Sequence, residues 1–224
     1  MKKILIALFC LIYSVASAQK KVEYGLKGGI LLSKFRGEDF NGIPPTSPSL
    51  NPERVTTNLS PTFGYTVGGY VRTLEDVFLQ AELLVSMKGA NIDRYTPGGK
   101  TSIQANFGQI DIPFSVGYKY KKVEVLGGLS FSTTFYDDGK LKTLLNQYAT
   151  IKSSPYQTLT LGYHIGAGVN LNRISINARF MGGIQQIVDA TVYYPDPNLP
   201  QGSKQSSFQQ RTDMWQLTVG YKLK

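Results

Sequence analysis

Apolar and polar side chains alternate along most of this chain. The stretch TLTLGYHIGAGVNL, residues 158–171, has an apolar residue at every odd position and a small or polar residue at every even one. A period of two indicates a β-strand, because successive side chains point to opposite faces. An ordinary globular strand has about five or six residues. The longer run is typical of a strand that crosses a bilayer at a tilt, which needs roughly nine to eleven residues.

The same alternation recurs along the chain and predicts eight strands. Their ranges are 23–34, 62–73, 77–93, 102–119, 123–135, 157–171, 174–189 and 209–223. The connections between them alternate in length. Tight turns are expected at 74–76, 120–122 and 172–173, and longer polar loops at 36–60, 94–101, 136–156 and 190–208. This pattern is typical of an all-β, antiparallel up-and-down transmembrane β-barrel with short periplasmic turns and longer outside loops. An even strand number then places both termini on the periplasmic side.

A soluble lipocalin-type barrel is the alternative architecture, and it would bury the apolar face inside and show the polar face to water. Two features favour the lipid-facing arrangement. The polar faces are rich in glycine, which suits the crowded interior of a narrow barrel. Aromatic residues on the apolar faces are expected near strand ends, where interfacial girdles lie. These aromatic residues are Tyr24, Phe63, Phe107, Tyr118, Phe131 and Tyr221.

The N-terminus resembles a secretory signal. Residues 1–18 combine a basic start, an apolar run and small residues before Gln19, which is the pattern of a cleaved signal peptide. We expect two parts, a signal peptide at 1–18 and an outer-membrane barrel domain at 19–224. The single cysteine, Cys10, lies in the signal. The mature chain then has no cysteine for a disulfide or a metal site.

Charge narrows the range of partners. The formal net charge is +9, and loss of Lys2 and Lys3 with the signal leaves about +7. The basic residues do not cluster with aromatic ones as a nucleic-acid-binding stripe would, so we expect no nucleic-acid partner. A basic surface suits anionic lipid phosphates, and we expect contact with outer-membrane lipid and lipopolysaccharide.

The polar strand faces collect charges of both signs. Residue parity places seven of them in the lumen: Lys27, Arg72, Glu82, Lys88, Asp111, Glu124 and Arg179. Isolated buried charges are costly, so opposite charges at similar depth should pair. We interpret this lumen polar cluster as a structural plug that holds the barrel together. A proton or ion path through the same groups is the functional alternative.

Candidate catalytic and cofactor residues are few. His164 is the only histidine, and no serine and carboxylate lie at a spacing that indicates a triad with it. Ser130 and Ser132 are interpreted as ordinary lumen hydroxyls. One histidine without cysteine does not supply a usual zinc ligand set, so we expect no metal and no cofactor. Eight strands leave an interior just wide enough for side chains, which argues against large-solute transport.

The longer loops are the expected sites of protein partners, because loops on a rigid scaffold commonly carry function. Loop 36–60 is too rich in proline for regular structure to be expected. Loop 136–156 has leucines at helical spacing, which predicts a short amphipathic helix. That helix could rest on lipid headgroups, dock a partner or cap the barrel mouth. Loop 190–208 carries aromatic residues and prolines suited to a binding edge.

Four fragments resemble one known family. They are YGLKGGILLSKF (24–35), FLQAELLVSMKGA (78–90), IDIPFSVGYKY (110–120) and GAGVNLNRISINARFMGGI (166–184). In this order they resemble the PorT-type outer-membrane β-barrel domain proteins of Bacteroidota, over nearly the whole mature chain. The resemblance implies a barrel of the cell envelope and a link to type IX secretion and gliding machinery.

We therefore expect an integral outer-membrane barrel that is a structural or partner-binding component and not an enzyme. Two alternatives from other classes remain. One is an outer-membrane lipid-modifying enzyme, and the other is a soluble carrier of hydrophobic ligands.

Overall fold

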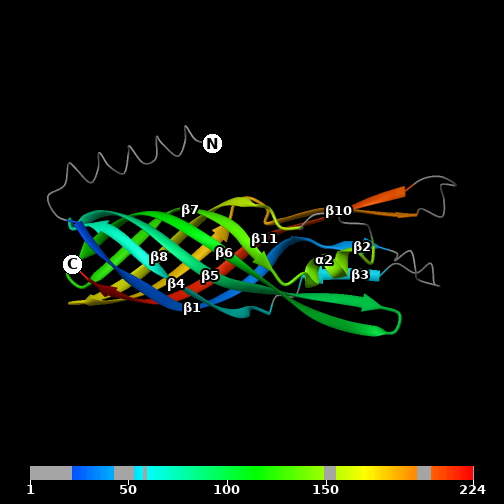
Figure 1. The fold of residues 1–224 in the computed structure, drawn as a ribbon, viewed down its shortest axis with the longest axis horizontal. Coiled ribbons are helices and arrows are strands. Elements are labelled where there is room, and N and C mark those ends of the chain that lie inside the picture. The colour runs from blue at the N-terminus through cyan, green and yellow to red at the C-terminus, as the bar shows by residue number, and fades with distance from the viewer. Residues whose placement is uncertain (1–21, 43–52, 58–59, 149–154, 196–202, 224) are drawn as a thin grey trace.

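The alternating segments form the barrel strands. The computed structural model describes residues 22–42, 53–57, 60–148, 155–195 and 203–223 (Figure 1). The barrel strands in these residues are β1 (Val22–Glu38), β4 (Thr62–Thr73), β5 (Val77–Thr96), β6 (Gly99–Tyr120), β7 (Val123–Asp137), β8 (Leu159–Leu171), β9 (Ile174–Gly183) and β11 (Ser203–Lys222). Each pairs antiparallel with its neighbours, and pairing of β1 with β11 closes the ring. The predicted eight-stranded up-and-down barrel is confirmed. The expected signal peptide at 1–18 lies outside the described residues.

The apolar face of the strands points outward. On β8, the side chain of Ile165 is 64% exposed while its neighbour His164 is buried. The same contrast separates Leu217 from Gln216 on β11. Apolar side chains around the outside and polar ones inside are the arrangement of a lipid-embedded barrel. A soluble carrier would have the inverse arrangement, so that alternative is excluded.

The predicted aromatic girdle is wrong for one residue, Phe107. Tyr24, Phe63, Tyr118, Phe131 and Tyr221 are exposed on the outer surface, as predicted. Phe107 is fully buried. It lies two residues from Gln109 on the same strand and therefore shares the inward face with it.

Glycine allows the strands to approach closely inside the barrel. A Cβ at Gly29 would lie 2.7 Å from Thr218 Cα on the next strand, and one at Gly68 would lie 2.9 Å from Leu84 Cα. Real Cβ atoms do not come so close, so larger residues here would force neighbouring strands apart. The predicted glycine-rich polar face is therefore a requirement of the narrow lumen.

The short turns gather at one end of the barrel, which we call the short-turn end. Lys121 and Asn172 have φ of 56° and 55° in the two tightest turns. Asn adopts this left-handed conformation more readily than most residues, and two-residue hairpin turns commonly require it. The start of β1 pairs with the end of β11, Gly25 opposite Lys222. The start of the first barrel strand and the end of the last one thus both lie at the short-turn end (Figure 1).

The opposite end, the loop end, is more regular than the sequence suggests. The expected loop at 94–101 is a hairpin in which β5 and β6 pair as far as Thr96 and Gly99. The loop at 36–60, expected to lack regular structure, contains β2 (Phe40–Gly42) and β3 (Glu53–Thr57), and β3 pairs with β5. The expected strand at 174–189 is interrupted, because β9 ends at Gly183 and β10 (Val188–Pro195) begins a separate hairpin with β11. The first two predictions are wrong because strand pairing continues beyond the lipid-facing pattern. The third is wrong because the chain leaves the barrel ladder after Gly183, where the backbone N–H groups of Ile184 and Gln185 both donate to Leu161 O.

A short helix closes the loop end. The predicted helix in 136–156 is confirmed as α2 (Lys140–Leu145), and Leu141, Leu144 and Leu145 are buried together with Tyr148. They pack into an apolar core with Phe35, Val55, Ala90, Ile92, Ala105, Phe107, Tyr156, Ile187, Val188, Ala190 and Phe208. Of the three roles considered for this helix, the structure shows the capping one. We call α2, β2, β3, β10 and the strand ends around this core the cap. In the described residues, no helix has the length and apolar character needed to cross a membrane.

Candidate functional site

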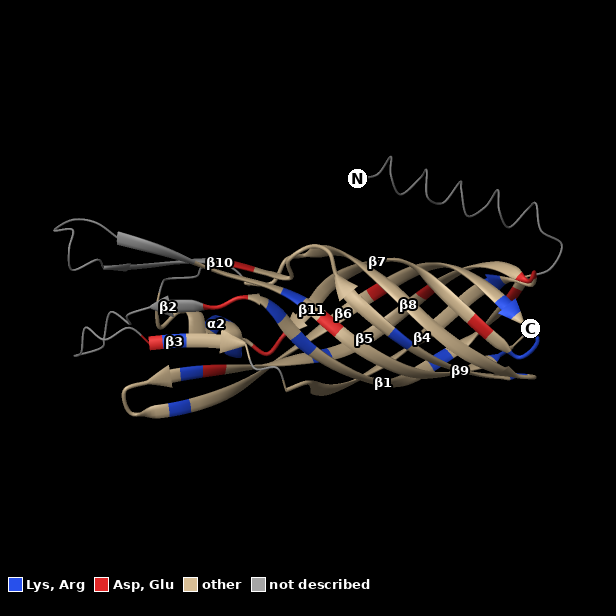
Figure 2. Ribbon diagram, turned by 180° about the vertical axis from the view of Figure 1, so that it is seen from behind, with Lys and Arg blue, Asp and Glu red and all other residues tan. Residues whose placement is uncertain are grey.

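All seven charged residues predicted to face the lumen are buried there. None is more than 5% exposed. They form three groups along the barrel axis. Arg72 and Glu124 lie near the short-turn end, Lys27, Glu82 and Arg179 near the middle, and Lys88 with Asp111 nearer the loop end. Figure 2 shows the positive and negative positions along these strands and again in the cap.

The group nearest the short-turn end is a bidentate ion pair across the lumen. Arg72 donates from Nη1 to Glu124 Oε2 at 2.6 Å and from Nη2 to Oε1 at 3.1 Å. Its Nε donates to Gln80 Oε1 at 2.8 Å, and its guanidinium carbon lies 4.5 Å from the centre of the Phe78 ring. Asn170 Nδ2 donates to Glu124 Oε2 at 2.6 Å. The group therefore ties β4 to β7 and β8, which are not its sheet neighbours.

The middle group centres on one carboxylate. Glu82 Oε1 accepts hydrogen bonds from Lys27 Nζ at 3.1 Å and from Arg179 Nη2 at 2.5 Å. Gln80 Nε2 donates to the same oxygen. Three strands separate β5 from β9 in either direction around the ring. The Glu82–Arg179 bond thus spans the full width of the barrel.

The third group binds one aspartate of β6 through donors on its two neighbouring strands, β5 and β7. Asp111 Oδ1 accepts from Lys88 Nζ at 2.8 Å and from Ser132 Oγ at 2.6 Å, and Oδ2 accepts from Ser86 Oγ at 2.7 Å. Lys88 Nζ also donates to Gln109 Oε1 at 2.9 Å. Ser132 is thus a partner of a buried carboxylate.

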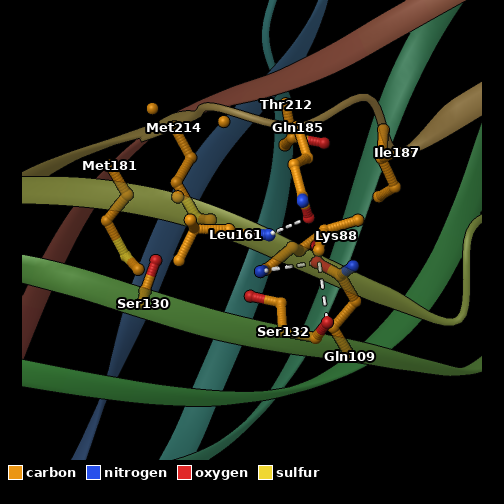
Figure 3. Close-up of a pocket in the computed structure, with 14 residues that line it drawn as sticks. Lys88, Gln109, Ser130, Ser132, Leu161, Met181, Gln185, Ile187, Thr212 and Met214 are labelled. Atoms are coloured by element: carbon orange, nitrogen blue, oxygen red, sulfur yellow. Dashed lines mark hydrogen bonds between the residues drawn. The ribbon is translucent and has the colours of Figure 1, made fainter.

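A small cavity lies beside this third group. It holds about 30 Å³ between Lys88 and Gln109 on one side and Met181 and Met214 on the other (Figure 3). Gln185 closes its wall by accepting a hydrogen bond from the Leu161 backbone N–H at 2.9 Å (Figure 3). Drug-sized ligands need roughly 300–1,000 Å³. The cavity has room only for water molecules, whose share of liquid volume is about 30 Å³ each.

His164 bonds a serine that the sequence did not single out. Its Nε2 lies 2.9 Å from Ser115 Oγ. Gly128 lies between them in the sheet, paired with Ser115 on one side and His164 on the other. Because Gly128 has no side chain, the two can meet across it. Among the described residues His164 Nδ1 has no hydrogen-bond partner, so the orienting carboxylate of a hydrolase triad is missing from this part of the chain.

The cap contains a polar contact of its own that the sequence did not indicate. Arg94 Nε and Tyr148 Oη both donate to Glu53 Oε2, each at 2.7 Å. Burial alone would raise the pKa of Glu53, but these hydrogen bonds and the Arg94 charge hold that pKa below its ordinary value. The contact joins β3 to β5 and to the residues after α2. In the residues that the structure describes, no three His, Cys, Asp or Glu side chains are placed to hold a metal ion.

Comparison with known proteins gives one family and several distant structures. The family model "Outer membrane protein beta-barrel domain" matches residues 17–189. No curated protein sequence matches the chain.

Three solved structures are similar at low identity. OprG from Pseudomonas aeruginosa is 13% identical, with TM-score 0.47, covering 92% of this chain and 97% of OprG. Ail, the attachment invasion locus protein of Yersinia pestis, is 11% identical, with TM-score 0.44, covering 91% and 99% of the two chains. AlkL, solved in DMPC lipid bilayers, is 10% identical, with TM-score 0.43, covering 89% and 90%. On the family match, the chain belongs to the outer membrane protein β-barrel domain family and is a β-barrel of the outer membrane.

Proposed function

We propose that this barrel is a structural and partner-binding component of the outer membrane, and neither an enzyme nor a pore for large solutes. The observation that carries the proposal is the filled interior. Ion pairs cross the lumen at the levels of Glu124 and Glu82, and the apolar core of the cap covers the loop end. The mature chain begins at Gln19, the loop end faces outside and the short turns face the periplasm.

The cap offers an edge suited to a protein partner. From Gly99 to Ala105, β6 pairs only with β5 in the described residues. The backbone of Asn106 is already bonded by Asp138, and pairing with β7 begins at Phe107. An exposed strand edge can accept an added strand from another chain. Loop 136–156 contributes α2, which contacts β6. Loop 36–60 contributes β3, which pairs with the other side of β5, and loop 190–208 contributes part of β10, which pairs with β11. Part of each loop lies outside the described residues.

A photo-crosslinking amino acid placed at Gln104 tests this role in living cells. Gln104 is exposed on β6, and Lys121 in a tight turn at the opposite end is the matched control. We expect a discrete protein adduct from position 104 and none from position 121. Equal adduct patterns at both positions, or no adduct at either, would contradict partner binding through the cap.

A conductance measurement tests the closed lumen independently. The purified barrel in a planar bilayer should give no stepwise current, because cross-lumen pairs and the cap fill the path. Regular current steps would contradict the plug and favour the ion path.

PorT-type membership and a link to type IX secretion are a finer proposal within the family. It is supported by the four fragments that resemble PorT-type proteins, which include Glu82, Asp111 and Arg179. Deletion of the gene should then reduce export of type IX cargo, with export restored by the wild-type chain. Unchanged export would remove this link and leave the barrel proposal intact.

The lipid-modifying enzyme is a second candidate, favoured only by the Ser115–His164 hydrogen bond. Both side chains are buried in the lumen, away from the lipid-facing surface. His164→Ala should leave the lipid A profile of the cell unaltered. An altered profile would support the enzyme.

A further inference from the structure

The outer surface of the barrel changes from apolar to basic at one place on its wall. Outward positions of β1 from Tyr24 to Leu32 and of β11 from Tyr221 to Trp215 carry no charge. The next outward positions toward the loop end are Lys34 and Arg36 on β1, and Asp213 and Arg211 on β11. We call these four residues the rim patch.

Strand register brings the rim patch together. Lys34 lies opposite Asp213, and Arg36 lies opposite Arg211, in the β1–β11 ladder. Arg36 donates from Nε to Asp213 Oδ2 at 2.7 Å and from Nη2 to Oδ1 at 3.3 Å. The patch therefore contains three basic side chains and one carboxylate, and that carboxylate is already bound by Arg36.

The facing arginines are unfavourable for the protein alone. Like charges directly opposite on one sheet face destabilise the pair. Lys34 and Arg211 have no ion-pair partner among the described residues, because the nearby carboxylate of Asp213 is bound by Arg36. In the cap, Arg94, Lys100 and Lys140 each have a carboxylate partner. An anion bound between Arg36 and Arg211 would remove the repulsion.

We propose that the rim patch binds a phosphate group of an outer-leaflet glycolipid of the lipid A type. The patch lies directly beyond the end of the apolar band, at the depth where lipid phosphates meet acyl chains. Arginine guanidinium groups bind phosphate through paired hydrogen bonds. Below the patch, Trp215 is 62% exposed and packs against Phe180 with ring centres 5.2 Å apart, a surface for the acyl chains of the same lipid. The choice of leaflet rests on the orientation given in the proposed function.

The single tryptophan of the chain makes the test specific. Trp215 is the only one, and it lies on the same face of β11 as the patch, four residues from Arg211. The barrel in phosphatidylcholine nanodiscs would be titrated with bisphosphorylated lipid A while Trp215 fluorescence is followed. The same titration would use dephosphorylated lipid A and inorganic phosphate alone.

We expect saturable binding of phosphorylated lipid A that is at least tenfold weaker for the dephosphorylated form and for Arg211→Gln. Arg211 has no described ion pair, so this variant should fold, and its mobility shift on boiling in SDS verifies that. Arg173→Gln, in a tight turn at the short-turn end, is the matched control and should bind like wild type. Equal binding by Arg211→Gln and wild type would overturn the site. If inorganic phosphate bound as tightly as phosphorylated lipid A, the assignment of the bound phosphate group to a glycolipid would be wrong.

The leaflet is tested separately. The only native cysteine, Cys10, lies in the expected signal peptide, so Gln104→Cys gives the mature chain a unique thiol. A membrane-impermeant maleimide should label it in intact cells. Failure to label, with labelling after lysis, would overturn the orientation and the outer-leaflet assignment. It would leave the measured phosphate binding as a separate result.

Discussion

The barrel wall and the cap are built by the same strands with opposite polarity. On β5, Glu82 and Lys88 face inward while Leu83 faces outward, but further on Ile92 is inward and fully buried and Asn91 lies on the outward face. β1 shows the same change, from Lys27 inside and Ile30 outside to Phe35 inside and Arg36 outside.

This inversion shows that the surrounding medium, and not the strand itself, decides which face is apolar. Within the membrane, the exterior must be apolar and the interior can be polar only if every charge is paired. Beyond the membrane, water surrounds the strands, and burial of apolar side chains between them becomes favourable. We therefore expect the membrane boundary near Ser33 on β1 and Lys88 on β5, where the polarity of the two faces changes.

The largest expected effect comes from breaking the polar interior. Arg179→Ala removes the bond across the full barrel width and leaves Glu82 with fewer donors. Loss of one partner of a buried ion pair typically costs about 3–5 kcal/mol. Urea unfolding of the barrel in lipid vesicles should show a lower free energy of unfolding by that amount. Arg173→Ala, an exposed turn residue, should change it little. An unchanged unfolding curve for Arg179→Ala would show that the plug does not stabilise the barrel.

The next effect compares the two outer surfaces directly. Ile165→Arg places a charge on the lipid-facing wall, where midplane arginine costs about 2–4 kcal/mol. Gln104→Arg places the same side chain on the outward surface of the cap, where surface substitutions are usually within about 0.5 kcal/mol. Both are measured by the same unfolding assay. Similar losses for both variants would mean that the membrane boundary lies elsewhere.

The sequence predicts the membrane-spanning part of the strands well, because contact with lipid requires alternation of apolar and polar residues there. Parity alone identified all seven lumen charges, because one face of each strand had to be apolar. The choice of partners was not predictable, since the Glu82–Arg179 bond joins residues 97 apart and depends on strand stagger. Ser115 was missed because its contact with His164 requires the register on both sides of Gly128.

The cap was less predictable for a physical reason. At its level the alternation continues but its polarity inverts, so charged positions such as Arg94 and Lys100 resemble loop residues although they lie on paired strands. The pairing of β3 with β5 connects distant segments, and nothing local in the proline-rich sequence around it indicates that contact. Phe107 was assigned to the lipid-facing surface, whereas it belongs to the apolar core of the cap.

The smallest expected effect is a pH dependence confined to the cap. Burial alone would raise the pKa of Glu53, but its hydrogen bonds from Arg94 and Tyr148 lower it below the ordinary value of 4.5. A carboxyl with a lowered folded-state pKa stabilises the fold fully above the ordinary pKa and loses that contribution as pH falls through the lowered value. Below about pH 4.5, protease cleavage within the cap should therefore increase while the barrel persists.

The Glu53→Gln variant sharpens this comparison. It removes the titrating group. Cleavage of the cap at neutral pH should therefore rise to about the level that the wild type reaches in acid, and it should no longer change between pH 6 and pH 3. Glu75→Gln, in the exposed turn at the short-turn end, should retain the wild-type pH profile. If Glu53→Gln kept that profile as well, the titration of another group would control the pH dependence of cap cleavage. The Arg94–Glu53–Tyr148 contact would then be incidental to the closure of the loop end.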